Sequence, residues 1–240
     1  MTTLIKIIVA TILSLTLFSC NFDLNPGIRG NGNVITKERT VNQSFSSIRA
    51  SEGLDVYLTQ GNTVSISVEA DENLQELIMT DIEEGVLKIH TKENIGRAAA
   101  KKVYVSFKDI SSIISTSGSD VFSTNTITSE TLNLKSSSGS DMKLDVNTSV
   151  LNCNSTSGSD MRLSGKTTKL IAEASSGSDI KAADLIAETS EVKASSGADI
   201  TINTSRELRA QASSGGDIKY YGNPEKVNKS DNASGSVRQQ

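Results

Sequence analysis

The chain has 240 residues, and its 24 Lys and Arg against 28 Asp and Glu give a formal net charge of −4 at pH 7. A mildly acidic chain lacks the basic footprint of nucleic-acid binders and of polybasic membrane patches, which argues against both. Two Cys, one His and an aromatic content of 4% leave little for a zinc site, a His-dependent triad or a stacking-based site. Composition therefore makes an enzyme the less expected class.

The first twenty residues have the pattern of an export signal. Lys6 precedes an apolar stretch from Ile7 to Phe18, which is shorter than the roughly 20 apolar residues that span a bilayer. The stretch ends in Leu-Phe-Ser-Cys at residues 17–20, which resembles a bacterial lipobox. The resemblance implies cleavage before Cys20 and acylation of its thiol and its new amine. The alternative is an ordinary signal peptide with a chance Cys.

This pattern divides the N-terminal region into a lipoprotein signal peptide over residues 1–19 and a lipid-anchored tether over residues 20–32. The tether is rich in Asn and Gly, as expected of a short linker. Asn21 stands where Asp would indicate retention in the inner membrane of some bacteria. We therefore expect an outer-membrane lipoprotein of a Gram-negative bacterium, facing either the periplasm or the cell surface.

Residues 33–115 alternate between apolar and polar side chains without a fixed period. Strands are predicted for VITKERTV, LDVYLTQ, VSISVEA, VLKIHT and VYVSF, and turns for QGN and EEG. ENLQELIMT, residues 72–80, is the one stretch with helical character. His90 alternates outward from Leu87 and Ile89 and is predicted to be a solvated surface residue. We interpret this half as degenerate rungs of the scaffold that follows.

A repeat dominates residues 116–222. The motif SxSGxD occurs six times, and successive glycines are 21, 19, 19, 20 and 18 residues apart. These glycines are Gly118, Gly139, Gly158, Gly177, Gly197 and Gly215. Weaker copies lie at Gly53 and Gly235. A period near 20 is too short for a propeller blade and lacks the leucine-rich repeat pattern, which leaves a β-solenoid with one rung per repeat.

Each repeat predicts strands with one buried face. The residue after each Asp is apolar, and apolar residues alternate again before each Gly. Gly supplies the positive φ or the close backbone approach of a tight corner. We expect two or three short strands per rung, stacked in parallel into a rod roughly 40 Å long. Cys153 takes an inward position equivalent to Leu134 and Ala172, which predicts a buried free thiol.

At this point the chain resembles a known family. After the lipobox come Phe45 and Ile48, then Gly-x-Asp-Val at residues 53–56 and Glu-Ala-Asp-x-Asn-Leu at residues 69–74, and then the serial SGSD rungs. This order is similar to that of the putative autotransporter adhesin, head GIN domain family of bacterial secreted and lipid-anchored proteins. The resemblance implies a single-stranded, right-handed parallel β-helix-like solenoid and no defined activity.

The repeated acidic residues would stack in one column on the rod surface. They are Asp120, Asp141, Asp160, Asp179, Asp199 and Asp217. Three arrangements could relieve their repulsion: a Ca²⁺ ladder, a neighbouring column of cations at Lys143, Arg162, Lys181 and Lys219, or Asx turns in which each Asp caps its own corner. The last two are favoured because the cations already balance the charge, so no cofactor is expected. The Ser and Thr columns are read as hydroxyl ladders, or alternatively as a hydrophilic binding strip.

The regular ladder is typical of a scaffold, whereas an active site should break the regularity, and no rung stands out in the sequence. We therefore expect no catalytic residues, and Cys20 is the only residue with an assigned chemical role. The candidate functions are an adhesin-like module that binds an unknown protein or glycan, a periplasmic structural or envelope-stress lipoprotein, and, less favoured, a polysaccharide-binding or polysaccharide-cleaving β-helix. Residues 33–222 are expected to form the solenoid, and residues 223–240 a C-terminal cap. The oligomeric state is not predicted.

Overall fold

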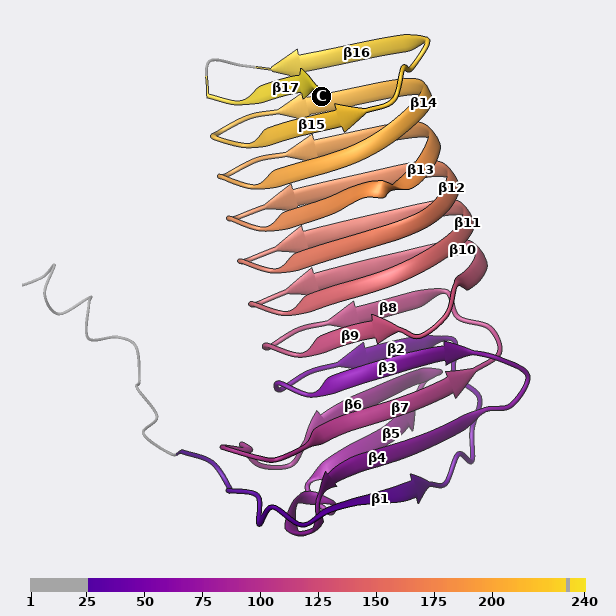
Figure 1. The fold of residues 1–240 in the computed structure, drawn as a ribbon, viewed down its shortest axis with the longest axis vertical. Coiled ribbons are helices and arrows are strands. Elements are labelled where there is room, and N and C mark those ends of the chain that lie inside the picture. Colours follow the sequence, from indigo (N-terminus) through magenta and orange to yellow (C-terminus); the bar gives the residue numbers. More distant parts are fainter. Residues whose placement is uncertain (1–25, 232–233) are drawn as a thin grey trace, which may run out of the picture.

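The strands pair into one continuous sheet that coils into a long rod (Figure 1). This computed structural model describes residues 26–231 and 234–240, so the predicted signal peptide and Cys20 lie outside the described residues. The elements are β1 (Val34–Arg39), β2 (Ser47–Ala50), β3 (Asp55–Gln60), β4 (Ser65–Asp71), η1 (Glu72–Leu74), β5 (Ile78–Glu83), β6 (Val86–Thr91), β7 (Lys101–Phe107), β8 (Ser112–Ser115), β9 (Asp120–Ser123), β10 (Ile127–Ser137), β11 (Asp141–Thr156), β12 (Asp160–Ser175), β13 (Asp179–Ala194), β14 (Asp199–Ala212), β15 (Asp217–Tyr221), β16 (Lys226–Asp231) and β17 (Ser236–Gln239). The predicted all-β class is confirmed. The stretch over residues 72–80 contains the 3-10 helix η1 and the start of β5.

Each regular rung is one long bent strand rather than two or three short ones. β11 and β12 each run for 16 residues, from the Asp after one corner to the last residues before the next corner. In Figure 1 these strands cross one side of the rod, bend at the far edge and return along the other side. We call the side that begins at the Asp the front face and the returning side the back face.

Neighbouring rungs pair in parallel with their repeats in register. Asp141 pairs with Asp160 and Asp160 with Asp179, a step of 19 residues. Equivalent residues therefore stack in columns along the rod, with a spacing of about 4.8 Å. The predicted β-solenoid is confirmed, with about seven turns whose parallel strands lie about 19 residues apart.

The first half departs from this regular stacking at the foot of the rod. β4 pairs antiparallel with both β1 and β7, and β5 pairs antiparallel with β6. β2 and β3 form a rung that lies between the β6–β7 pair and the β8–β9 pair, since they pair in parallel with both. Residues 33–115 thus contain rungs of the predicted kind, but β1, β4 and β5 form an antiparallel end that the alternation did not reveal.

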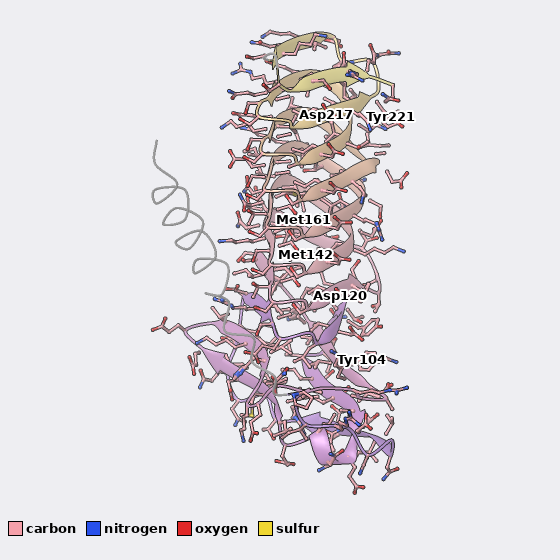
Figure 2. The ribbon with its side chains drawn as sticks, turned by 90° about the vertical axis from the view of Figure 1, so that its left-hand side faces the viewer. Tyr104, Asp120, Met142, Met161, Asp217 and Tyr221 are labelled. Atoms are coloured by element: carbon pink, nitrogen blue, oxygen red, sulfur yellow. The ribbon has the colours of Figure 1, made fainter. Side chains whose placement is uncertain are left out.

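The core consists of apolar side chains that point between the two faces. The residue after each Asp is buried in every copy: Val56, Val121, Met142, Met161, Ile180, Ile200 and Ile218. Met142 and Met161 lie in neighbouring rungs, one above the other (Figure 2). Burying a side chain of this size contributes about 1.5–3 kcal/mol. A one-residue slip would expose the whole set, so the pattern fixes which side of each strand turns inward.

Residues 223–240, predicted as a cap, add one more rung at the tip. β16 pairs in parallel with β14, and β17 with β15, so that Ser236 lies beside Asp217. The weak downstream copy of the motif is therefore the corner of the last rung. Exposed Lys226, Lys229 and Arg238 lie on this edge, and charged side chains at a sheet edge oppose pairing with another chain.

Candidate functional site

The corner of each regular rung is a Ser-Gly pair in left-handed backbone. Ser157 has a φ of +58° and Gly158 a φ of +68°, and the other five copies have similar values. Positive φ at two successive central residues is the backbone of a type I′ turn. The upstream copy uses Glu52 and Gly53 in the same way. The sequence predicted the glycine, but not the left-handed residue before it.

Hydrogen bonds between rungs hold these corners together. The N–H of Gly139 donates to the carbonyl oxygen of Ser157 in the next rung at 3.1 Å. Below the turn, the buried hydroxyls of Ser136 and Ser140 are 2.9 Å apart, and Ser140 Oγ also lies 2.9 Å from the carbonyl oxygen of Ser115 in the neighbouring rung. The reading of these serines as hydroxyl ladders is therefore confirmed where they are buried.

The front face begins with a column of carboxylates. The six predicted Asp residues pair rung to rung, and Asp55 extends the column towards the foot. Asp120 and Asp217 mark two levels of this column in Figure 2. Two unit charges at the spacing of one rung repel by about 0.9 kcal/mol in water. The column therefore needs partners that relieve this repulsion.

Cations in the adjacent column supply part of that relief. Lys181 Nζ lies 2.9 Å from a carboxylate oxygen of Asp160 and 2.9 Å from one of Asp179. Arg162 lies 3.9 Å from Asp160. These two carboxylates sit in neighbouring rungs, so Lys181 bridges the repelling pair. The predicted column of cations is confirmed at these rungs.

At four of the six regular corners a serine side chain caps the turn in place of the Asp, so the Asx-turn alternative is wrong there, whereas Ala198 and Gly216 take that position in the other two. Ser140 Oγ donates to the carbonyl oxygen of Ser137 at 2.8 Å and accepts from the N–H of Ser137 at 3.1 Å. Ser119, Ser159 and Ser178 repeat this geometry in other copies. The Asp side chains instead meet groups of neighbouring rungs, such as Lys181 and, at the tip, the Ser236 hydroxyl.

Two of the six regular rungs lack a cation beside their Asp, and both of these carboxyl groups are harder to ionise than a free Asp side chain. Phe122 stands beside Asp120, and Thr201 beside Asp199, where other rungs have Lys or Arg. Burial, together with the charges of the carboxylates in the rungs above and below, raises the pKa of Asp120 and of Asp199. The charge of the column is therefore uneven along the rod.

The calcium alternative gains no support from this geometry. Ca²⁺ takes six to eight oxygen ligands around itself, whereas a straight column offers carboxylates from one side only. In the part of the chain that the structure describes, no group of three or more His, Cys, Asp and Glu side chains is placed to hold a metal ion.

Beside the Asp column runs a second outward column, which we call the outer stripe. From foot to tip it consists of Tyr104, Tyr57, Phe122, Lys143, Arg162, Lys181, Thr201, Lys219 and Arg238. Tyr57 stacks on both Tyr104 and Phe122, with ring centroids 5.1 and 5.2 Å apart. The three rings come from β7, β3 and β9, which are not consecutive in the chain. Sequence reasoning missed the stack for this reason.

A groove of about 550 Å³ lies along the cationic part of the outer stripe. Lys143, Arg162 and Lys181 line one side of it, and Ser164 and Asp184 belong to the next outward column. The pairing of β12 with β13 shifts by one residue beside this groove, so β13 carries a bulge. The regular repeat predicts that no rung differs from its neighbours, but β13 differs through this bulge. Bulges are frequent next to functional sites because they re-aim side chains, so we take the outer stripe and this groove as the candidate site.

Comparison with known families decides where the chain belongs. Residues 44–224 match the model of the family described as "putative auto-transporter adhesin, head GIN domain". The chain belongs to this head GIN domain family. The family that the sequence resembles is thus confirmed, and the matched residues include the β2–β3 rung and all six regular corners.

Solved structures share the fold of this head GIN chain. A protein from Bacteroides fragilis described as a putative adhesin has a TM-score of 0.82 at 21% identity, over 89% of this chain and 100% of that one. A putative adhesin from Parabacteroides merdae has a TM-score of 0.71 at 19% identity, over 89% and 98% of the two chains. A Parabacteroides distasonis protein described as a putative lipid binding protein has a TM-score of 0.71 at 21% identity, over 89% and 99%. At these identities the likeness concerns the fold.

Two further findings bear on the head GIN chain as a whole. The comparison with curated proteins gives no match. Within residues 26–231 and 234–240, no helix is long and apolar enough to span a bilayer.

The two single residues that the sequence analysis discussed lie away from the outer stripe. His90 Nε2 lies 3.2 Å from Asp81 Oδ2, and its side chain is 35% exposed, so it is a paired surface residue rather than a fully solvated one. Cys153 is a buried free cysteine, as predicted, and burial raises the pKa of its thiol. A buried, protonated thiol is a weak nucleophile.

Proposed function

We propose that this head GIN protein is a lipid-anchored, non-catalytic component of the bacterial envelope that binds an extended protein or glycan partner along its front face. Family membership supports an adhesin-like role in the envelope. The Leu-Phe-Ser-Cys motif at residues 17–20 supports a lipid on Cys20, and Asn21 after it supports an outer-membrane location.

The outer stripe is the observation that carries the binding role. Its nine residues stand in register on nine stacked strands, so they form a continuous line about 38 Å long, at about 4.8 Å per step. A partner that extends along the rod meets one side chain of the stripe at every rung, aromatic near the foot and mostly cationic towards the tip. Many weak contacts of this kind add up to useful avidity without a deep pocket.

The binding role is tested with two triple variants of equal charge change. The front-face variant carries Lys143→Ala, Arg162→Ala and Lys181→Ala, and the back-face control carries Lys135→Ala, Lys193→Ala and Arg209→Ala. Purified proteins are applied to arrays of glycans and matrix proteins and to neighbouring bacterial cells. We expect the front-face variant to lose at least tenfold in binding while the control retains it. Equal binding by both variants would contradict the assigned surface.

The anchor is tested with Cys20→Ala in the parent cells. The proposal predicts that the native protein fractionates with the outer membrane and that the variant, which lacks the acyl chains, does not. A native protein whose Cys20 carries no acyl chains by mass spectrometry would refute the anchor.

A further inference from the structure

The C-terminal part of the segment predicted as a short tether is docked on the foot of the rod. Ile28 N donates to the carbonyl oxygen of Asn94 at 2.8 Å, and Gly96 N donates to that of Ile28 at 3.0 Å. Gly30 N donates to the carbonyl oxygen of Arg97 at 2.9 Å. We call residues 26–33 the strap. The expected tether over residues 20–32 is therefore too long, because residues 26–32 belong to the strap.

A buried carboxylate clasps the strap to the rod. Asp71, at the end of β4, is fully buried and accepts hydrogen bonds from Gly32 N at 2.5 Å, Ala99 N at 2.8 Å and Ala100 N at 3.1 Å. Burial opposes ionisation of Asp71, but these three N–H groups and that of Asp71 itself together outweigh it and lower its pKa. The clasp thus joins the strap to the segment that leads into β7.

Neighbouring side chains fasten the strap on both sides of this clasp. Asn73 Oδ1 accepts from Asn31 N at 2.9 Å, while its Nδ2 donates to the carbonyl oxygen of Arg29 at 2.8 Å. Asn33 Nδ2 donates to Glu72 Oε2 at 2.9 Å. Asn73 and Glu72 belong to η1, which explains why a short helix sits here: it presents polar side chains to the strap.

The glycines of the strap are required by close packing. A Cβ on Gly30 would lie 2.3 Å from Asp71 Oδ1, and one on Gly27 would lie 2.6 Å from the Asn94 carbonyl oxygen. Both distances are below any that real Cβ atoms show. The Gly-rich composition that suggested a linker therefore reflects, in residues 27 and 30, close contact with the rod.

The docked strap limits how far the rod can stand from its lipid. Pro26 is six residues after Cys20, and six residues span at most about 21 Å. On the front face the strands run from β1 at the foot through β4, β7, β3, β9, β11, β12, β13, β14 and β15 to β17 at the tip. These ten spacings amount to about 48 Å. The tether is therefore less than half as long as the rod.

We propose that the foot of the rod, made of the strap, β1 and η1, is the surface that faces the lipid headgroups, and that the tip points away from the membrane. This inference rests on the proposed acylation of Cys20. Figure 1 shows the strap entering at the foot, at the opposite end from β17. The foot carries charges of both signs, including the Lys37–Glu76 pair at 3.5 Å, and such a surface fits phosphate and ammonium headgroups. The outer stripe is then displayed outward from the bilayer.

The test uses the natively acylated full chain in vesicles of phosphatidylethanolamine and phosphatidylglycerol that contain a headgroup-labelled quencher lipid. A fluorophore is attached through Glu76→Cys at the foot or Lys226→Cys at the tip, whose native side chains are 84% and 67% exposed. Cys153 is buried and leaves the introduced thiol as the reactive one. We expect at least threefold stronger quenching at the foot than at the tip. Equal quenching at both positions would mean that the rod lies flat and would overturn the proposal.

The clasp is tested in the same vesicles with Gly30→Ala, which drives a methyl group into Asp71. Gly61→Ala is the matched control, because its Cβ would meet only Ser106 Oγ at an ordinary 3.7 Å. We expect Gly30→Ala to reduce quenching of the foot label at least twofold, since a released strap more than doubles the tether. The control should match the parent chain, and unchanged quenching in Gly30→Ala would overturn the role of the strap.

Two additional measurements separate the possible failures. Asp71→Asn keeps the side-chain volume and serves as a second clasp variant. In this variant, faster hydrogen exchange at the amide groups of Ala99 and Ala100 reports release of the strap without loss of the fold. The mass of the N-terminal peptide reports acylation. An unmodified Cys20 would overturn both this inference and the proposed anchor, whereas an acylated chain with a distant foot would overturn this inference alone.

Discussion

Asp120 illustrates how a single residue reports on the electrostatics of its column. Its neighbours in the rungs above and below are Asp141 and Asp55, and its own rung has Phe122 in place of a cation. Asp160, in contrast, contacts Lys181 at 2.9 Å. An ionised Asp at this place in the motif therefore lowers the stability of the fold at Asp120 and raises it at Asp160.

This contrast predicts opposite effects for two identical substitutions. The pKa of Asp120 is raised in the folded chain, so the folded state holds the proton more tightly than the unfolded state. The free energy of unfolding therefore falls as the pH rises from the pKa of Asp in the unfolded chain, about 3.9, through the higher pKa of Asp120 in the folded chain. This loss of stability is fully present at pH 7. Asp120→Asn should therefore raise the free energy of unfolding at pH 7, by less than about 1 kcal/mol because the group is partly exposed.

The control for this prediction is Asp160→Asn, which removes a partner of Lys181 and should lower the free energy of unfolding at pH 7. Urea titrations at pH 7 and at pH 3 measure both variants. The gain in Asp120→Asn should vanish at pH 3, below the unfolded pKa. A loss of stability in Asp120→Asn at pH 7 would show that the column is not under repulsion there.

Removal of divalent metal ions tests whether the Asp column depends on Ca²⁺ for its stability. The Asp column is relieved in part by Lys181 and Arg162, so the solenoid should not need Ca²⁺. We expect the same midpoint of thermal unfolding with a chelator as with millimolar Ca²⁺. A midpoint that is several degrees lower in chelator would contradict this and support the calcium alternative.

At the scale of the element, the corner turn recurs with the same backbone conformation in every regular rung. Both residues of each Ser-Gly pair have positive φ, and Asn is the preferred partner of Gly in such turns, whereas Ser tolerates left-handed backbone less well. Ser157→Asn should therefore raise the free energy of unfolding by about 0.5 kcal/mol.

The companion variant Gly158→Ala should lower the free energy of unfolding by about 1–2 kcal/mol, the cost of left-handed backbone for a residue with a Cβ. Its Cβ would meet nothing within 4 Å, so the effect isolates the backbone. Denaturant melts of the two variants beside the parent chain measure both. Equal stability of parent and Gly158→Ala would mean that the corner is not strained.

The strands of the rungs could be predicted from the sequence, whereas their order at the foot could not. Alternation and the repeat place Met142, Met161 and Ile180 inside because the same side of every rung is buried. The position of β2 and β3 between β6–β7 and β8–β9 depends on pairings between residues far apart in the chain, and no local pattern encodes these.

The candidate site could likewise be predicted only in part from the sequence. The columns of Asp and of Lys and Arg follow from the repeat, because equivalent residues of successive rungs must stack. The Tyr104–Tyr57–Phe122 stack and the docking of the strap could not be read from it, since Tyr104, Tyr57 and the whole strap lie outside the periodic region. The clasp at Asp71 lies within the residues that carried the family resemblance, but their spacing gives no sign that the carboxylate is buried.

At the scale of the whole molecule, the rod must protect its two ends. β1 closes the foot by antiparallel pairing with β4, and the β16–β17 rung closes the tip. Removal of residues 224–240 would leave the backbone groups of β14 and β15 unpaired on one edge, and would uncover Leu208 and Ile218, which are fully buried in the intact chain. Unpaired strand edges are templates for pairing with another chain.

A chain that ends at residue 223 should therefore form dimers or larger species at micromolar concentration, while the intact chain does not add to itself through this edge. Light scattering of the two proteins side by side measures the difference. A truncated chain with the same mass in solution as the intact chain would show that the last rung is not a cap.

We propose that this head GIN rod is held in the bacterial envelope by its foot and displays its front face to a partner outside the cell. Protease shaving of intact cells, with a periplasmic protein as the internal control, tests this most directly. We predict that the protein is lost while the periplasmic control survives. Protection of the protein until the envelope is permeabilised would contradict the adhesin-like role and place the rod in the periplasm.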